Sequence, residues 1–370
     1  MMVENMKLIL CTLFDSNYLD KGLVLIDSLK RVCKNFVLYV LPMDEKCSCV
    51  LKNLKISGVI VIEYSLFEDD DLKKVKTERS HAEYCWTCTA KLISFVLEYY
   101  NEEICTYIDS DLYFYSDPSE LIQNMLEKNK SVQIIKHNFC KYERKYKEKK
   151  CGVYCVEFNT FLNEKNSKKV LESWIKDCLT DCSYEKNEEV LGDQKYLNNW
   201  PQRFGCIDIS ANLGAGVAPW NVNRLKILPG PSGAEIFDKE TKATYKLIFF
   251  HFQNLRFIEK SAVYCCEVIP WNYMGLKKIY EDYLKEILKK KDFLKEQYGI
   301  DLMLKQHPVE SGMMPIQHIP FGRRCARELK KGFRYFGRFI IEKIKMKINY
   351  YLYYKRMKKI IIKYGDDKNE

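Results

Sequence analysis

The chain has 370 residues, of which 47% are hydrophobic and 14% aromatic, so it can bury a large core and is not intrinsically disordered. No stretch reaches the ~18 uncharged apolar residues that a membrane-spanning helix needs, and the apolar run at 8–14 is too short for a signal peptide, so we expect a cytosolic protein. The net charge of +10 comes from residues 321–370, which hold 16 Lys and Arg against 5 Asp and Glu; the first 320 residues are near neutral.

The first third of the chain alternates strand and helix patterns. Apolar and β-branched runs predict strands at 8–14, 35–41, 58–64 and 104–108, and apolar residues at helical spacing predict helices at 19–32 and 81–100. A helix is expected after Pro118, then a strand at 131–135, a very basic loop at 141–150 and a less regular, turn-rich region to about residue 280. This order predicts an α/β fold with a mostly parallel sheet flanked by helices.

The cysteines indicate no metal or disulfide framework. The chain has 16 of them, but the Cys85–Cys88 pair is a lone CxxC with no second pair at zinc spacing. In a large cytosolic domain we expect reduced thiols that behave as small hydrophobic residues.

Asp109-Ser110-Asp111 follows the predicted strand at 104–108. Parallel sheets bind ligands at the carboxyl ends of their strands, and two carboxylates one residue apart can reach a single hard cation. Such a cation stabilises the charge that builds on a departing diphosphate. An Asp-x-Asp by itself is also common as a solvated turn or a helix cap, so its context has to carry the interpretation.

That context resembles a known family. Residues 107–118, YIDSDLYFYSDP, resemble the "YLDADhhhhxD" segment of bacterial GT-A (Rossmann-like) glycosyltransferases, and are most similar to the family-eight-like transferases that use nucleotide-diphosphate sugars. Four further segments agree in order: CTLFDSNY at 11–18, TAKL at 89–92, GDQKYL at 192–197 and FFHF at 249–252. The resemblance spans about residues 7 to 256.

The resemblance implies a metal site. Asp109 and Asp111 match the metal-binding pair, and His251 matches the third protein ligand. An imidazole ligand favours Mn²⁺ over Mg²⁺ as the cofactor. The alternative for His251 is an ordinary buried histidine at the end of a strand.

The resemblance also implies contacts with the nucleotide-sugar donor. The matching residues are Thr12, Asn17, Lys91, Asp109, Ser110, Asp111 and Asn159. Lys91 stands where the family often has Arg, and an exposed helix lysine is the alternative. Thr12 and Asn17 could instead be ordinary strand-end capping residues. Asn159 is followed by Thr160 and Phe161 rather than the family's "FNxGh" pattern, which leaves the sugar preference open.

Asp193 and Gln194 match the pair near the anomeric carbon in the family and are the expected catalytic residues. Retention of configuration is implied by the resemblance alone. An amide is a poor nucleophile, so front-face substitution is favoured over a covalent glycosyl-enzyme. The family's "HxxGxxKPW" ending is altered, because NLGAGVAPWN at 212–221 precedes His251. Its glycines could let backbone N–H groups approach phosphate, and Trp220 could stack on a sugar or belong to the core.

The expected domains are a transferase domain over 1–310, with a nucleotide-binding half (1–130) and an acceptor half (131–310), and a basic amphipathic helical tail over 321–364. Apolar residues from Phe333 to Leu352 recur at helical spacing among Lys, Arg and Tyr, which suits an anionic membrane surface on the inner face of the membrane. A helix packed on its own domain is the alternative, and no module that reads nucleic acid is present.

The sequence therefore predicts a metal-dependent hexosyltransferase that uses a nucleotide-diphosphate sugar, with UDP favoured. The expected acceptor is a saccharide or a lipid-linked glycan of the cell surface, such as a polysaccharide or lipopolysaccharide core. A catalytically inactive, membrane-attached sugar-nucleotide-binding protein is one alternative. A sugar-nucleotide pyrophosphorylase is another, although the loop at 14–18 lacks the glycines of that class.

Overall fold

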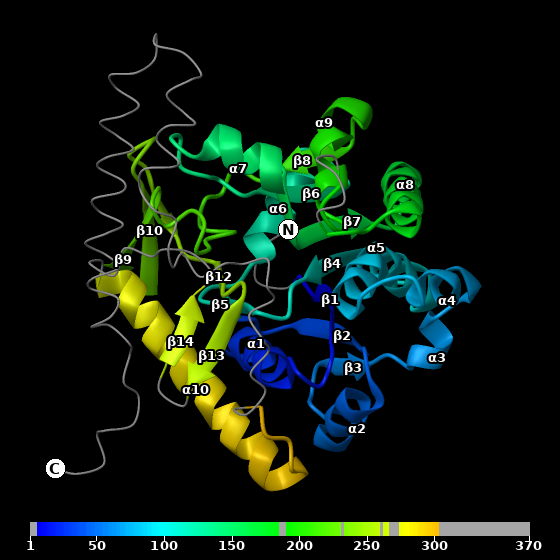
Figure 1. The fold of residues 1–370 in the computed structure, drawn as a ribbon. Helices are drawn as coiled ribbons and strands as arrows, with labels where there is room; N and C mark the ends of the chain where they lie inside the picture. Colours follow the sequence, from blue (N-terminus) through cyan, green and yellow to red (C-terminus); the bar gives the residue numbers. More distant parts are fainter. Residues whose placement is uncertain (1–5, 185–189, 231–232, 260–261, 266–273, 303–370) are drawn as a thin grey trace, which may run out of the picture. The chain divides into compact units, whose positions relative to one another are not determined.

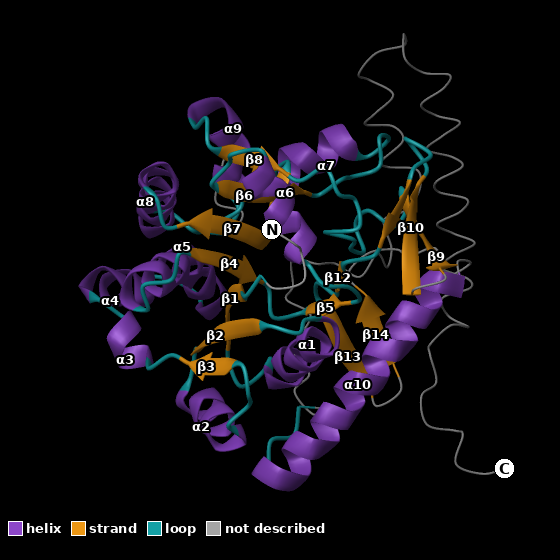
Figure 2. Ribbon diagram, turned by 180° about the vertical axis from the view of Figure 1, so that it is seen from behind, coloured by secondary structure: helices purple, strands orange, loops and turns teal. Residues whose placement is uncertain are grey.

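The computed structural model describes residues 6–184, 190–230, 233–259, 262–265 and 274–302. Its largest sheet has the strand order β3-β2-β1-β4-β7-β6-β8 (Figures 1 and 2). The strands are β1 (Leu8–Phe14), β2 (Phe36–Pro42), β3 (Val59–Val61), β4 (Ile104–Ile108), β6 (Val132–Lys136), β7 (Tyr154–Leu162) and β8 (Ile207–Ile209). Strands β3, β2, β1 and β4 are parallel, as are β6 and β8, whereas β7 runs antiparallel to both β4 and β6. The predicted mostly parallel α/β sheet is confirmed.

Helices cover both faces of this sheet. Helix α1 (Leu19–Val32) lies on the face of Phe14, whose ring presses so closely on Gly22 that a Cβ there would fall 2.4 Å from it. Helix α5 (His81–Tyr99) packs on the opposite face with α8 (Lys165–Thr180), in the apolar cluster that includes Cys11. Helix α5 begins with a capping box in which Ser80 and Glu83 satisfy each other's backbone N–H groups.

Smaller sheets and short helices complete the described elements. The remaining strands are β5 (Leu112–Phe114) paired with β12 (Phe249–His251); β9 (Leu225–Gly230), β10 (Gly233–Asp238) and β11 (Thr244–Lys246) in one sheet; and β13 (Leu255–Glu259) paired with β14 (Ala262–Cys265). The remaining helices are α2 (Glu45–Leu54), α3 (Tyr64–Phe67), α4 (Asp70–Lys76), α6 (Ser119–Glu127), α7 (Arg144–Cys151), α9 (Trp200–Arg203), α10 (Met274–Tyr298) and the 3₁₀ helix η2 (Lys195–Asn199).

The chain forms two compact units. The first contains Met1–Gln253 and Ile269–Ile300, and therefore holds every element except the β13–β14 pair. The predicted boundaries at 130 and 310 stay predictions, and the predicted helical tail at 321–364 lies outside the described residues. Within the described residues, no helix is long and apolar enough to cross a bilayer.

The structure differs from the sequence-based expectation in the middle of the chain. The expected basic loop at 141–150 contains helix α7, which an ion pair between Arg144 and Glu240 ties to the β10–β11 turn. The expected irregular region contains β7 and α8. Helix α8 buries Val170, Leu171, Trp174 and Cys178 at helical spacing, a pattern that the sequence carries but that its many lysines obscure.

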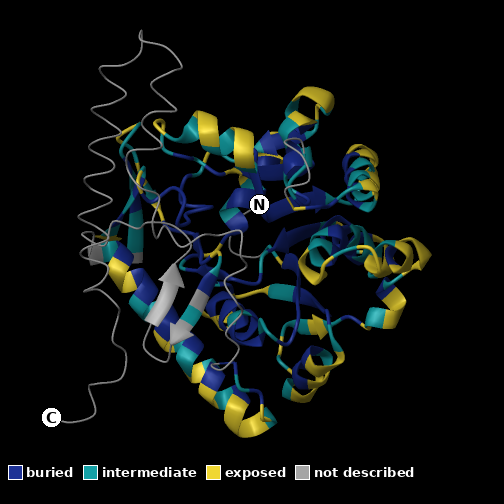
Figure 3. Ribbon diagram, viewed as in Figure 1, coloured by how far each residue is buried: buried dark blue, intermediate teal, exposed yellow. Residues whose placement is uncertain are grey.

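The core lies between the sheet and its helices, where most strand residues are buried (Figure 3). Beneath α8, Trp174 meets Trp200 edge-on with ring centroids 5.2 Å apart, and it stacks on Phe161. Such aromatic pairs contribute about 0.5–1.5 kcal/mol beyond their buried area. The cysteines whose side chains are described have free thiols, and most of them are buried.

Candidate metal and donor site

Two short strands bring distant residues together at the carboxyl end of β4. Strand β4 ends at Ile108, and a turn closed by a hydrogen bond from the Leu112 N–H to the Asp109 carbonyl leads into β5. Strand β12 pairs antiparallel with β5, so that His251 lies opposite Leu112. The Phe252 N–H donates to the carbonyl of Asp111 at 3.0 Å, which fixes the register. The backbone therefore delivers His251 to the Asp109–Asp111 turn.

The three side chains converge. The Nε2 atom of His251 lies 3.0 Å from Oδ1 of Asp111 and 3.7 Å from Oδ2 of Asp109. All three potential ligand atoms lie within 4.8 Å of one another. The Asp109 side chain keeps 30% of its surface exposed, against 11% for Asp111 and 5% for His251, so Asp109 faces the approach to the cluster. Carboxylate oxygens with one imidazole are a donor set that Mn²⁺ accepts.

The pKa values of Asp109, Asp111 and His251 are shifted in different directions. Burial raises the pKa of Asp109 to about 6; the neighbouring charges of Asp111 and Glu157 add to that rise, and His251 opposes it. Burial also acts on Asp111, but the closer His251 holds the pKa of that carboxyl below its ordinary value. Burial would lower the pKa of His251, yet Asp111 and the other acidic neighbours raise it well above its ordinary value.

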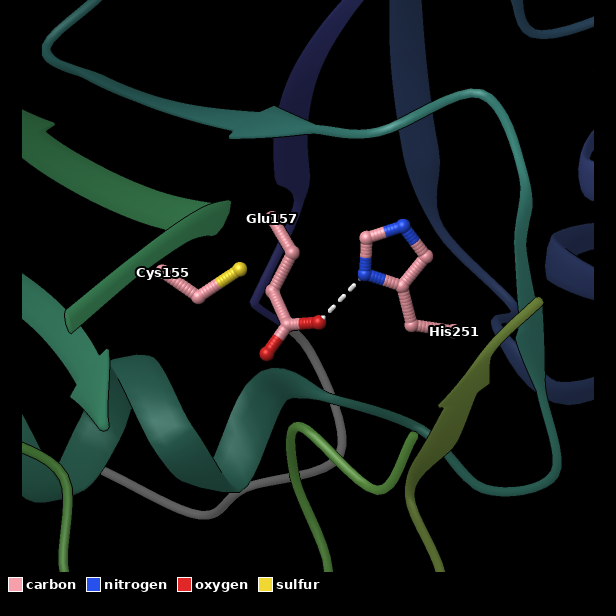
Figure 4. A group of neighbouring side chains, drawn as sticks. All are labelled: Cys155, Glu157 and His251. Carbon is pink, nitrogen blue, oxygen red and sulfur yellow. Dashed lines mark hydrogen bonds and ion pairs between the residues drawn. The ribbon is translucent and has the colours of Figure 1, made fainter. Parts of the chain in front are cut away.

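A third carboxylate, Glu157 on β7, stands behind the histidine and was missed by the sequence analysis. Its Oε2 accepts a hydrogen bond from Nδ1 of His251 at 2.7 Å, and its side chain is fully buried. Cys155, Glu157 and His251 point toward one another in Figure 4. Three carboxylates thus surround one imidazole, an excess of negative charge that fits a bound divalent cation. Only the alternation of β7, with Glu157 two residues before Asn159, could have drawn attention to it.

Asp193 also lies near this cluster. Burial, followed by the charge of Asp109, raises its pKa to about 7, and Thr89 on α5 counteracts part of that rise. A hydrogen bond holds the backbone of Asp193 in place, because the indole N–H of Trp174 donates to the Asp193 carbonyl at 2.8 Å. The preceding Gly192 has φ +54°, and a Cβ there would meet the Trp86 ring at 3.0 Å. Asp193 is therefore a predicted catalytic residue on which the charge of Asp109 acts.

Gln194 and Asn159 are placed differently. The Gln194 side-chain amide donates to the carbonyl of Cys151, the last residue of α7, at 2.7 Å. Asn159 lies on β7 opposite Tyr107 of β4 and is fully buried. Neither its amide nitrogen nor its amide oxygen has a protein partner among the described residues. Their predicted roles stay predictions.

The predicted donor contacts after β1 form an ordered loop. Asp15 accepts hydrogen bonds from the Asn17 N–H and from the Asn17 side chain, and its carboxylate also meets His81 at 3.1 Å. Thr12 is fully buried within β1, and its hydroxyl has no partner among the described residues. Ser110 is buried in the Asp109–Asp111 turn. The loop ends at the same edge of the sheet as Asp109, because β1 and β4 are parallel.

Lys91, whose predicted donor contact stays a prediction, and Lys21 are placed differently relative to the acidic residues. Lys91 forms an ion pair with Asp69 at the start of α4. It is two residues beyond Thr89 on α5, about 200° around the helix from the side that faces Asp193. Lys21, on the first turn of α1, is instead close enough to Asp111 for its charge to help lower the pKa of that carboxyl. Lys21 was not among the residues predicted from the sequence.

The glycine-rich segment before His251 packs against the site. A Cβ on Gly214 would fall 1.8 Å from the Lys246 carbonyl oxygen, and one on Gly216, which has φ +72°, would fall 2.6 Å from Oε1 of Glu157. Trp220 is buried, donates its indole N–H to the His137 carbonyl and meets the His251 ring edge-on at 5.3 Å. These contacts favour the core interpretation of Trp220 over sugar stacking.

Two surface hollows lie elsewhere. One, of about 490 Å³, runs between α4 and α8, and the other, of about 430 Å³, lies beside α1 and α10. Neither is lined by a member of the acidic cluster. We place the candidate site at Asp109 because titratable groups that converge at the carboxyl ends of strands indicate a functional site, whereas an open surface hollow by itself does not.

Comparison with known proteins gives relatives of two kinds. No family model matches the chain. Two uncharacterized proteins of Bacillus subtilis (strain 168) are similar in sequence. YfnD is 28% identical over 285 residues, which is 74% of this chain and 86% of that protein. YfnF is 28% identical over 257 residues, which is 68% of this chain and 83% of that protein.

Glycosyltransferases are among the solved structures that are similar to the chain. Mouse xyloside xylosyltransferase 1 is 14% identical with a TM-score of 0.43, over 67% of this chain and 98% of that one. The galactosyltransferase LgtC in complex with donor and acceptor sugar analogs is 14% identical with a TM-score of 0.44; the match covers 77% of this chain and 96% of that one. The function proposed next is inferred from the residues of the site.

Proposed function

We propose that this chain is a metal-dependent glycosyltransferase that moves a hexose from a nucleotide-diphosphate sugar, with UDP as the favoured nucleotide, to a hydroxyl of a saccharide or lipid-linked acceptor of a cell-surface glycan. The observation that carries the proposal is the convergence of Asp109, Asp111 and His251 at the carboxyl end of β4, with more buried carboxylates than cations around them. A binding protein for neutral ligands would not need that excess.

The three residues would hold Mn²⁺ or Mg²⁺, which, when bound, would stabilise negative charge on the diphosphate as it leaves. Lys21 would add a positive charge to the same phosphates, because its charge already reaches Asp111. The ordered Asp15–Asn17 loop at the end of β1 lies at the same sheet edge and would contact the nucleoside. Thr12, Ser110, Lys91 and Asn159 remain proposed donor contacts.

The transfer breaks the bond between the anomeric carbon and the diphosphate oxygen and forms a bond from that carbon to the acceptor oxygen. We propose retention by front-face substitution, in which the acceptor proton passes to the departing phosphate oxygen. Asp193, near Asp109, would bind sugar hydroxyls, and Gln194 would lie along the reactive face. A membrane-bound acceptor would also account for the basic 321–370 segment.

The test is metal-dependent release of UDP from a panel of UDP-sugars, with and without candidate acceptors. We expect release with Mn²⁺, none with EDTA, and loss of activity in Asp111→Asn. The matched control is Asp208→Asn, which removes the charge of a buried carboxylate on β8 that is bonded to Lys128 and Gln133. No release with any donor, together with no Mn²⁺ binding, would overturn the proposal.

A further inference from the structure

The imidazole of His251 is held at both of its nitrogens by carboxylates from different strands. Its Nε2 faces Asp111 at 3.0 Å, while its Nδ1 lies 2.7 Å from Oε2 of Glu157. A carboxylate can only accept, so Nδ1 donates its N–H to Glu157. That hydrogen bond turns the other nitrogen, Nε2, toward the Asp109–Asp111 pair.

Glu157 holds a second member of the trio through its backbone. The N–H of Asp109 donates to the carbonyl of Glu157 at 3.1 Å, where β4 and β7 meet. One residue thus fixes the ring of His251 with its side chain and the backbone of Asp109 with its carbonyl. Neither contact is needed for the β12–β5 pairing, which has its own backbone hydrogen bonds.

The space around Glu157 is shaped for this role. Its side chain is fully buried, and its Oε1 has no protein partner among the described residues. Gly216 approaches that oxygen so closely that any Cβ would clash with it. A buried carboxylate with one unpartnered oxygen is costly, and a glutamine would form the same hydrogen bond at lower cost. Packing alone therefore does not explain why this residue is a charged glutamate.

We propose that Glu157 is the positioning residue of the metal site, which orients His251 so that Nε2 is presented as a ligand and strengthens it as a donor. This inference rests on the proposed function. Partners of this kind behind a metal-bound histidine typically change metal affinity by about 10–100-fold.

Cys155, Glu157 and His251 form a second group of residues with possible ligand atoms within 4.8 Å of one another. All three side chains of that group are buried, whereas Asp109 is partly exposed. A cation bound to a diphosphate can therefore reach the His251 ring more easily from the side of Asp109 and Asp111, and Glu157 lies on the opposite side of the ring.

The test measures Mn²⁺ dissociation constants in the absence of donor, by electron paramagnetic resonance of free Mn²⁺. We expect Glu157→Gln to weaken Mn²⁺ binding about 10-fold and Glu157→Ala up to about 100-fold, with Asp208→Asn unchanged. Asp111→Asn, which removes a ligand, should bind no measurable Mn²⁺. Because glutamine matches glutamate in size, Glu157→Gln keeps the test informative if the alanine variant does not fold.

The outcomes separate the two proposals. Wild-type affinity in both Glu157 variants, with binding lost in Asp111→Asn, overturns the positioning role and leaves the transferase proposal standing. Complete loss in Glu157→Gln, matched by loss in Cys155→Ala, makes Glu157 a ligand on the other side of the ring and also overturns positioning. A wild-type protein that binds no Mn²⁺ and releases no UDP overturns both.

Discussion

Removing the charge of Asp109 should make the metal-free protein more stable. Burial and two neighbouring carboxylates raise the pKa of Asp109 to about 6, so the folded state resists its ionisation. Between pH 4 and pH 6 the folded protein holds this proton more tightly than the unfolded chain does, so the free energy of unfolding falls as pH rises through that window. Above pH 6 the full penalty is present, and Asp109→Asn abolishes it.

The size of the gain follows from the shift in pKa. A rise from 3.8 to about 6 corresponds to about 3 kcal/mol as an upper bound, at 1.36 kcal/mol per pKa unit. Relaxation around the new amide reduces this, so we expect a gain of about 1–3 kcal/mol at pH 7.5, or roughly 2–8 °C in the unfolding midpoint. The amide oxygen can still accept the hydrogen bond that the Tyr107 hydroxyl donates to Asp109 at 3.0 Å.

The assay is thermal unfolding in EDTA at several values between pH 4 and pH 8, repeated with excess Mn²⁺. We expect Asp109→Asn to be more stable than the wild type at pH 7.5, equal to it near pH 4, and not stabilised further by Mn²⁺. A variant less stable than the wild type at pH 7.5 in EDTA would refute the reasoning. In that case Asp109 would be a structural partner of His251 rather than a member of a repulsive ligand set.

Three further changes have defined outcomes. Asp193→Asn should raise the unfolding midpoint at pH 8 but not at pH 4, because burial raises the pKa of Asp193 to about 7. The same variant should bind Mn²⁺ with wild-type affinity. A loss of stability at pH 8 would contradict this prediction. Gly216→Ala should lower the free energy of unfolding by about 1–3 kcal/mol in denaturant titrations because of its φ of +72° and its clash with Glu157, whereas Gly205→Ala, with no atom within 4 Å of the new Cβ, should be neutral. Deleting residues 321–370 should abolish sedimentation with anionic vesicles, with neutral vesicles as the control; unchanged sedimentation would refute a membrane role for the tail.

Much of the nucleotide-binding half could be predicted from the sequence, because its elements carry strong local patterns. Strand β1, helix α1 and strand β4 begin and end at the residues that the apolar spacing predicted, and α5 differs by one residue at its end. Helix α8 was missed because ten of its 16 residues are charged or polar, a composition that also suits a loop, although its buried residues recur at regular helical spacing.

The site could be predicted only in part. Asp109 and Asp111 lie one residue apart and follow a clear strand, so local reasoning found them. His251 was proposed from a family resemblance, because the three-residue strands β5 and β12 that bring it to Asp111 are too short to carry a periodic signal. Only the fold brings the charge of Lys21 near Asp111 and the carboxylate of Glu157 to His251. Apart from the alternation of β7, no local pattern distinguishes these two residues from an ordinary helix lysine and an ordinary strand residue.

The arrangement around His251 is easier to explain as a binding site than as a structural ion pair. A buried ion pair contributes little to stability and can often be replaced by apolar residues of similar volume. Here one imidazole faces Asp111 and Glu157 directly, Asp109 adds a third carboxylate, and Gly216 leaves room beside an oxygen that no described residue satisfies. These acids together carry an excess of negative charge, open to solvent at Asp109, and such a set of oxygen ligands suits the divalent cation of the proposed function.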